Sequence, residues 1–277
     1  MRIAVAVLAL AAVVALAGAA VVDVVSPARA TAGHGNIINL GTVGPGQTVE
    51  IAIANDTHAI TMGNSTSSLS NADWDDLRVL RHELPEGWMG EDSRKYENPL
   101  KAHVIISKQA ADGDYVVGLI ALDEYEEVAP VEFKARVTVS RNVFMMGVVR
   151  EPVKAEPREK VSYALELENT GSASDAFTVS MSGLTKELDA SKNVFVPHNS
   201  KATVEFSFPA PEVGDYAPVF EARSQSSVEL KAAAAARLFV GTSFISDAKA
   251  AARGVLLFPT PQGIAYALAA LLAALLA

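Results

Sequence analysis

Apolar and polar residues alternate along most of the middle of this chain. Residues 48–54 read TVEIAIA, which places Val49, Ile51 and Ile53 on one side of an extended segment. The same pattern recurs in three later segments, at residues 131–139 (VEFKARVTV), 161–167 (VSYALEL) and 203–208 (TVEFSF). A period of two is typical of half-buried strands, and short strands separated by Gly, Pro, Asn and Asp favour β-sandwiches over α/β folds. The sequence therefore predicts an all-β body.

Two halves of this body share landmarks. The tripeptide Gly-Asp-Tyr occurs at residues 113–115 and again at 214–216, each time beginning an apolar strand. We expect Tyr115 and Tyr216 to bury their rings while each hydroxyl group bonds to the backbone at a corner of the sandwich. We assign one sandwich to residues 31–140, with a polar insertion near residues 61–81, and a second to residues 141–240.

Two further motifs accompany the Gly-Asp-Tyr turns, at residues 166–171 (ELENTG) and residues 84–88 (LPEGW). Together these motifs resemble immunoglobulin-like extracytoplasmic modules of the NEW3 and CARDB kind, which are common in archaeal and bacterial surface proteins, and the resemblance covers about residues 35–240. It implies two tandem immunoglobulin-like β-sandwiches. Its motifs are architectural and imply no activity, and the second half lacks the Gly-Trp pair.

The N-terminal end is a continuous apolar segment. Residues 3–22 carry no charge, follow Met1-Arg2, and are long enough at about 1.5 Å per residue to cross a bilayer. Ala28-Arg29-Ala30 then fits the small-x-small pattern that signal peptidases accept. We predict that residues 1–30 are a signal peptide or a retained N-terminal membrane helix, and the sequence leaves cleavage open.

The C-terminal end is also uncharged. Residues 255–277 follow a predicted linker at residues 241–254, and Pro259 and Pro261 delay the expected helix to near Gln262. This helix is short for a full span, and no basic residue follows it. It can be a tilted anchor, a tail removed in exchange for another attachment, or an apolar plug for a partner subunit. The full prediction is an all-β body flanked by N- and C-terminal apolar helices, held outside the cell membrane.

Composition excludes several classes of function. The net charge of −9 argues against a nucleic-acid partner, because such a partner requires a basic face. The chain has no cysteine, so it has no disulfide framework, thiolate metal site or cysteine nucleophile. No HExxH, G-x-S-x-G or Gly-rich phosphate loop occurs, and we predict no enzymatic activity and no cofactor.

Two acidic clusters and two sequons are the remaining candidate sites. Carboxylates at alternate loop positions can hold Ca²⁺, although neither cluster matches the loop of an EF-hand. The calcium candidates are Asp73, Asp75, Asp76, Asp123 and Glu124. Asn55 and Asn64 begin N-x-Ser/Thr sequons in or beside the polar insertion and are the glycosylation candidates.

The leading functional hypothesis is a membrane-anchored surface protein. Its two immunoglobulin-like modules would serve as a spacer and a protein-binding platform, with the bilayer and other envelope or membrane proteins as partners, and homo-oligomers are possible. One alternative is a fibre subunit that donates a terminal strand, from residues 31–40 or 231–240, to its neighbour. A second alternative is a carbohydrate- or ligand-binding accessory module, which would use aromatic residues such as Trp74 and Trp88.

Overall fold

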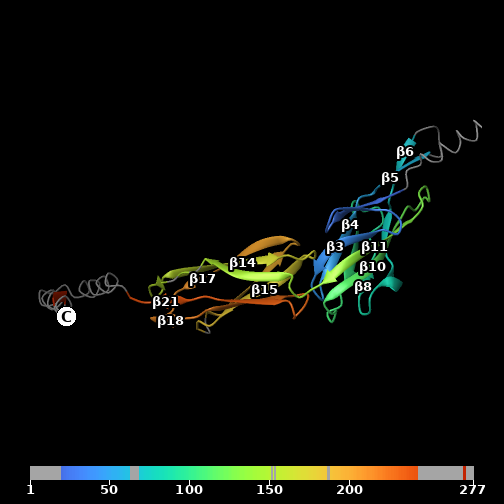
Figure 1. Ribbon diagram of the computed structural model, residues 1–277. Helices are drawn as coiled ribbons and strands as arrows, with labels where there is room; N and C mark the ends of the chain where they lie inside the picture. The colour runs from blue at the N-terminus through green and yellow to red at the C-terminus, as the bar shows by residue number, and fades with distance from the viewer. Residues whose placement is uncertain are drawn as a thin grey trace, which may run out of the picture.

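The computed structural model describes residues 20–62, 69–150, 152, 154–185, 188–242 and 271–272. Within this part of the chain, two β-sandwiches follow one another, and Figure 1 shows them joined end to end. Alternation produces the strands: in β11 (Val131–Val139), Val131, Phe133 and Ala135 are buried and the residues between them are exposed. The body is all-β, as the alternating pattern predicts.

The first sandwich has immunoglobulin-like topology. One sheet has the order β2-β1-β4-β9-β8, formed by Ala30–Ala32, Val22–Ser26, Thr48–Ile53, Leu100–Ile105 and Met89–Glu91. The facing sheet has the order β3-β11-β10-β7, formed by Ile37–Val43, β11, Gly113–Leu122 and Asp76–Val79. In this plan β1-β4-β9-β8 correspond to strands A-B-E-D of an immunoglobulin domain and β11-β10-β7 to G-F-C, while β2 pairs outside β1 and β3 runs parallel to β11. A hairpin of β5 (Asp56–Met62) and β6 (Leu69–Asp73) is inserted before β7.

The second sandwich repeats this plan with small changes. One sheet has the order β12-β14-β17, formed by Phe144–Arg150, Lys160–Asn169 and Ser200–Pro209. A second has the order β16-β15-β19-β20, formed by Ala190–Val196, Asp175–Ser182, Val219–Ser224 and Lys231–Ala235. A third, β13-β21-β18, is formed by Lys154–Ala155, Leu238–Val240 and Gly214–Tyr216. Each sandwich has its own core, with Trp74 and Phe133 in the first and Phe177, Phe206 and Phe220 in the second.

The two Gly-Asp-Tyr turns form the same corner in both sandwiches. The hydroxyl group of Tyr115 donates to the carbonyl oxygen of Ala111 at 3.0 Å, and that of Tyr216 donates to the carbonyl oxygen of Glu212 at 2.9 Å. Both bonds reach back four residues at the start of strand F, which is the geometry of a tyrosine corner. The predicted corner bonds are therefore confirmed, while both rings are only partly buried against their cores.

The prediction that apolar helices flank the sandwiches is wrong. Between residues 20 and 242, no described residue lies in an α-helix, and η1 (Arg81–Glu83) is a short 3-10 turn. The end of the predicted N-terminal helix instead contains β1, in which Val22 and Val24 are buried and pair across the sheet, while Asp23 between them is partly exposed. The described pair Leu271–Leu272 is helical and exposed, and residues 1–19 and the remainder of 255–277 lie outside the described residues. None of the described residues belongs to a helix with the length and apolar character of a membrane span.

The two segments considered as donor strands are paired within their own chain. Residues 30–32 and 37–43 form β2 and β3, which pair with β1 and β11. Residues 231–235 and 238–240 form β20 and β21, which pair with β19 and with β13 and β18. In this structure, each of these strands completes its own sandwich.

The second sandwich contacts the first through two of its loops. The loop before β15 begins the contact, where the Ser172 amide donates to the carbonyl oxygen of Thr42 at 2.7 Å. The loop at residues 225–230 continues it, because a Cβ atom added to Gly46 would lie 2.6 Å from the carbonyl oxygen of Ser226. Gly46 also has a φ of +78°, so the approach depends on glycine. These are the B–C and F–G loops of the second sandwich.

A buried carboxylate lies at the centre of this junction. Asp175 is 3% exposed and accepts hydrogen bonds from Gln47 Nε2 of the first sandwich at 2.8 Å and from Ser224 Oγ at 2.7 Å. Its other oxygen accepts from Ser226 Oγ and from the Ala176 amide, both at 2.8 Å. A buried charge is tolerated where hydrogen bonds satisfy it in this way. The network therefore joins the two sandwiches through a fully bonded polar core.

Candidate functional site

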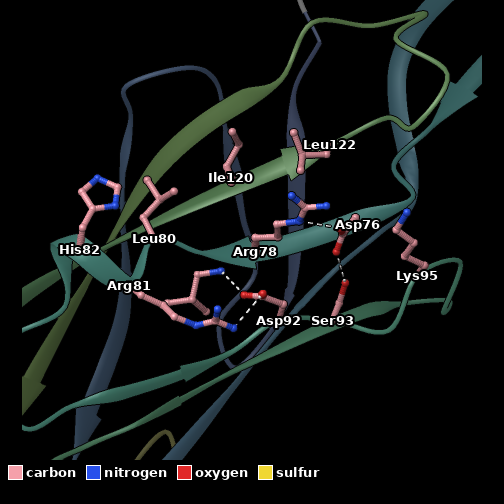
Figure 2. Close-up of a pocket in the computed structure, with 11 residues that line it drawn as sticks. Asp76, Arg78, Leu80, Arg81, His82, Asp92, Ser93, Lys95, Ile120 and Leu122 are labelled. Carbon is pink, nitrogen blue, oxygen red and sulfur yellow. Dashed lines mark hydrogen bonds and ion pairs between the residues drawn. The ribbon is translucent and has the colours of Figure 1, made fainter.

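A groove lies on the outer face of the first sandwich. It has a volume of about 880 Å³ and runs over β7 and β10, bordered by η1 and by residues 92–95 (Figure 2). Its apolar floor consists of Leu80, Ile120 and Leu122, which are partly buried. Concave sites with an apolar floor and a few fixed polar groups are typical of binding sites.

The alternation in β7 and β10 produces this surface. In β7, Leu77 and Val79 point into the core, so that Asp76 and Arg78 point outward. The register places Arg78 opposite Ile120 and Asp76 opposite Leu122 on β10. Side chains directly opposite one another in antiparallel strands lie close together, so that charged residues of β7 flank apolar residues of β10.

Gly118 allows η1 to close one end of the groove. The Leu80 amide donates to the carbonyl oxygen of Gly118 at 2.9 Å. A Cβ atom at residue 118 would collide with the carboxylate of Glu83 and lie 3.0 Å from Leu80 Cδ1. The lack of a side chain at this position therefore lets the side chains of Glu83 and Leu80 lie directly on the sheet.

Two aspartates fix the two arginines of the groove. Asp76 Oδ2 accepts from Arg78 Nε at 2.7 Å, and Asp76 Oδ1 is 3.4 Å from Ser93 Oγ. Asp92 Oδ2 accepts from Arg81 Nη2 at 3.0 Å, while its other oxygen accepts from the Val79 amide at 2.9 Å. Figure 2 shows both pairs, with the guanidinium group of Arg78 extending toward Leu122. Because Asp92 is bound to the backbone of β7, the position of Arg81 is tied to the sheet.

The outer edge of β7 is already bonded. The Leu77 amide donates to Ser93 Oγ at 2.8 Å, and the Ser93 amide donates to the carbonyl oxygen of Leu77 at 2.8 Å. Together with the bond from the Val79 amide to Asp92, these contacts occupy three of the backbone groups that an added strand would need. A ligand of this groove must therefore be held by side chains.

The structure brings some of the calcium candidates together and not others. Asp75 and Asp123 are both buried, and Asp75 Oδ2 accepts from the Glu124 amide at 3.0 Å. Asp123 accepts the amides of Tyr125, Glu127 and Val128 at 2.9 to 3.1 Å. These carboxylates thus cap loop backbone, whereas Asp76 belongs to the groove and Asp73 ends β6. The described residues contain no group of three His, Asp or Glu side chains arranged to hold a metal ion.

Among the calcium candidates, Asp75 has a pKa that burial raises. Loss of solvation chiefly raises the pKa of Asp75, and the nearby charges of Asp123 and Glu124 raise it further, against the opposing bond from the Glu124 amide. Glu124 behaves in the opposite way, because hydrogen bonds from the Tyr96 hydroxyl group and from Lys95 lower its pKa. Tyr96 and the neighbouring Tyr125 are both well exposed.

The two aromatic residues suggested for carbohydrate binding are buried. Trp74 is 0% exposed and its Nε1 donates to the carbonyl oxygen of Val21 at 3.1 Å. Trp88 is 7% exposed and packs against Tyr115 with ring centroids 5.1 Å apart. Both therefore belong to the first core, and neither offers a ring face to a sugar.

Asn55 has a structural role. Its Nδ2 donates to the carbonyl oxygens of Trp74 and Glu97 at 3.1 and 3.0 Å. Asn55 therefore joins the loop that contains Trp74 to the loop that contains Glu97. Asn169 follows the same plan in the second sandwich, where its Nδ2 donates to Ala173, Val196 and Pro197. Asn64, the other glycosylation candidate, lies outside the described residues.

Sequence reasoning missed Arg78, Arg81 and the apolar residues between them. The signal that could have found them is the outward position of Arg78 in the alternating segment DLRV and of Ile120 and Leu122 in GDYVVGLIAL. The pairing of β7 with β10 was also needed, because it brings residues about 40 positions apart onto one surface.

Comparisons with known proteins gave structural neighbours only. No family model and no curated protein matches the chain. Fibronectin(III)-like modules of Clostridium thermocellum CbhA align over 79% of this chain and 93% of their own, with 12% identity and a TM-score of 0.27. A chimeric titin Z1Z2 aligns over 82% of this chain and 100% of its own, with 10% identity and a TM-score of 0.36. A β-glucosidase from Listeria innocua aligns over 36% of this chain and 16% of its own, with 14% identity and a TM-score of 0.27.

Proposed function

We propose that this protein is a non-catalytic interaction protein of the cell exterior, in which the second sandwich is a spacer and the first carries the binding surface. The junction is the observation that supports this proposal. The B–C and F–G loops form the binding end of many immunoglobulin-like domains, and in the second sandwich both loops are packed against the first. The corresponding end of the first sandwich lies at the far end of the pair (Figure 1).

The proposal includes attachment to a membrane through apolar sequence. The second sandwich ends with β21 at Val240, and the uncharged residues 255–277 follow after a short interval. The lipid bilayer would then hold the C-terminal side, and other envelope or membrane proteins would meet the first sandwich. An acidic body of net charge −9 suits this arrangement, because anionic headgroups repel it.

Surface labelling tests this proposal. An antibody raised against the folded body is applied to intact cells that produce the full chain, and membrane and soluble fractions are then compared. We expect the antibody to bind intact cells and the chain to sediment with membranes. Labelling that appears only after lysis would contradict an exterior location, and a fully soluble chain would contradict attachment.

A further inference from the structure

The groove of the first sandwich is a basic surface on an acidic protein. Three basic side chains, Arg78, Arg81 and Lys95, line it together with His82, against two acidic ones, Asp76 and Asp92. The two arginines are more exposed than their acidic partners: the side chain of Arg78 is 49% exposed against 9% for Asp76, and that of Arg81 is 65% exposed against 30% for Asp92. Lys95 is paired with Glu124 at 2.9 Å, so each basic group has an acidic partner, and the basic character of the groove comes from the greater exposure of the arginines.

Both guanidinium groups are positioned before any ligand arrives. Among the described residues, Arg78 is bonded through Nε alone, so its two terminal amino groups remain available to the groove. Arg81 uses Nε toward the carbonyl oxygen of Gly90 and Nη2 toward Asp92, which leaves Nη1 available. Arg78 therefore presents two terminal amino groups, whose paired donors match the geometry of a carboxylate, whereas Arg81 adds the single amino group Nη1.

The floor and the edge of the groove narrow the class of ligand further. The floor is aliphatic, formed by Leu80, Ile120 and Leu122, and no Phe, Tyr or Trp lines this groove. Aliphatic side chains suit branched apolar side chains of a protein better than the ring of a sugar. The bonded edge of β7 excludes strand addition there, so that side chains of the ligand must supply the recognition.

We propose that this groove binds an acidic, aliphatic segment of a partner protein, with carboxylates on Arg78 and Arg81 and Leu-like or Ile-like side chains on the floor. This assignment rests on the proposed function in that it names the partner of an interaction protein. A smaller hollow of about 200 Å³ adjoins the groove and carries Asp123, Glu124 and Glu126. Arg78 lines both hollows, whereas Arg81 lines the groove alone, so a carboxylate bound to Arg81 lies on the η1 side, away from these acidic residues.

Peptide binding to the full-length protein in nonionic detergent tests the assignment. The probe is a short fluorescein-labelled peptide of Glu, Leu and Ser, followed by fluorescence anisotropy. Two comparison peptides replace every Leu by Ser or every Glu by Lys. The protein variants are Arg78→Gln combined with Arg81→Gln, and a control, Arg136→Gln, which changes an exposed arginine elsewhere on the same sheet.

We expect the Glu–Leu peptide to bind more tightly than either comparison peptide. The double variant should bind it about tenfold more weakly, while Arg136→Gln should bind it as wild type does. Circular dichroism would verify that each variant is folded. Equal binding to the double variant and the control would overturn the assignment. So would a preference for the Lys–Leu peptide, or binding of an anionic oligosaccharide with no binding of the Glu–Leu peptide. Surface labelling is independent of these results, so the two proposals can fail separately.

Discussion

Gln47 is the residue whose loss should most clearly separate the two sandwiches. It is 0% exposed, and its Nε2 donates to the carboxylate of Asp175 at 2.8 Å while its Oε1 accepts from the Gly44 amide at 2.7 Å. A hydrogen bond to a charged group contributes about 2 kcal/mol and a neutral one about 1 kcal/mol. Gln47→Ala should therefore lower the stability of the docked pair by about 3 kcal/mol.

Two probes of urea unfolding can detect the loss of coupling. The chain has two tryptophans, Trp74 and Trp88, both in the first core, so tryptophan fluorescence reports that sandwich alone. Far-ultraviolet circular dichroism reports both sandwiches. In the wild-type protein the docked pair should give coincident transitions by the two probes, whereas Gln47→Ala should separate them.

The matched control for this experiment is Gln109→Ala. Gln109 is exposed and lies in a loop at the same end of the first sandwich, so its replacement should change stability by less than about 0.5 kcal/mol. The reasoning is refuted if Gln47→Ala costs no more than Gln109→Ala, or if its two transitions remain coincident.

Three further predictions concern single side chains. Tyr115→Phe and Tyr216→Phe should each lower unfolding free energy by about 1 kcal/mol in urea, because each removes one corner hydrogen bond; no change would argue against the corners. The raised pKa of Asp75 means that its charged form is disfavoured by folding, so Asp75→Asn should raise the melting temperature at pH 7. This advantage should fade as the pH falls below the ordinary carboxyl range, and a gain that persists at low pH would contradict the cause given. Mass spectrometry of the native protein should find Asn55 without glycan, because its Nδ2 already donates two internal hydrogen bonds; a glycan there would contradict this role.

The sequence predicted the features that depend on local periodicity. The alternation in residues 131–139 places every second residue in the core, and the position of Tyr115 and Tyr216 after Gly-Asp is sufficient to predict their corner bonds. These features require only the pleat of a strand and a turn of fixed geometry.

The N-terminal boundary was mispredicted for a physical reason. Residues 3–22 are apolar throughout, and the strand residues Val22, Val24 and Val25 extend this run past a single aspartate. Hydropathy alone cannot separate the apolar segment from the strand that follows it, because a strand with one charged outward residue resembles the end of an apolar segment. The pairing of β1 with β4 distinguishes them, and that contact joins residues well separated in the sequence.

The candidate groove and the junction depend on long-range pairing. Gln47 and Asp175 are 128 positions apart, and neither has a local signal that identifies its partner. Similarly, Arg78 and Ile120 lie on one surface because β7 pairs with β10 in a particular register. A shift of one residue in that register would turn Arg78 away from the groove, so no pattern within β7 alone could locate the site.

The central claim is that the two sandwiches form one continuous body, in which the first sandwich is held at a fixed distance from the second. Because the natural chain has no cysteine, Lys134→Cys and Thr203→Cys would carry spin labels at two exposed positions, one in each sandwich, without competing thiols. Double electron–electron resonance would then give the distribution of distances between them. The buried network around Asp175 predicts a single narrow distribution, and a broad distribution would contradict the account.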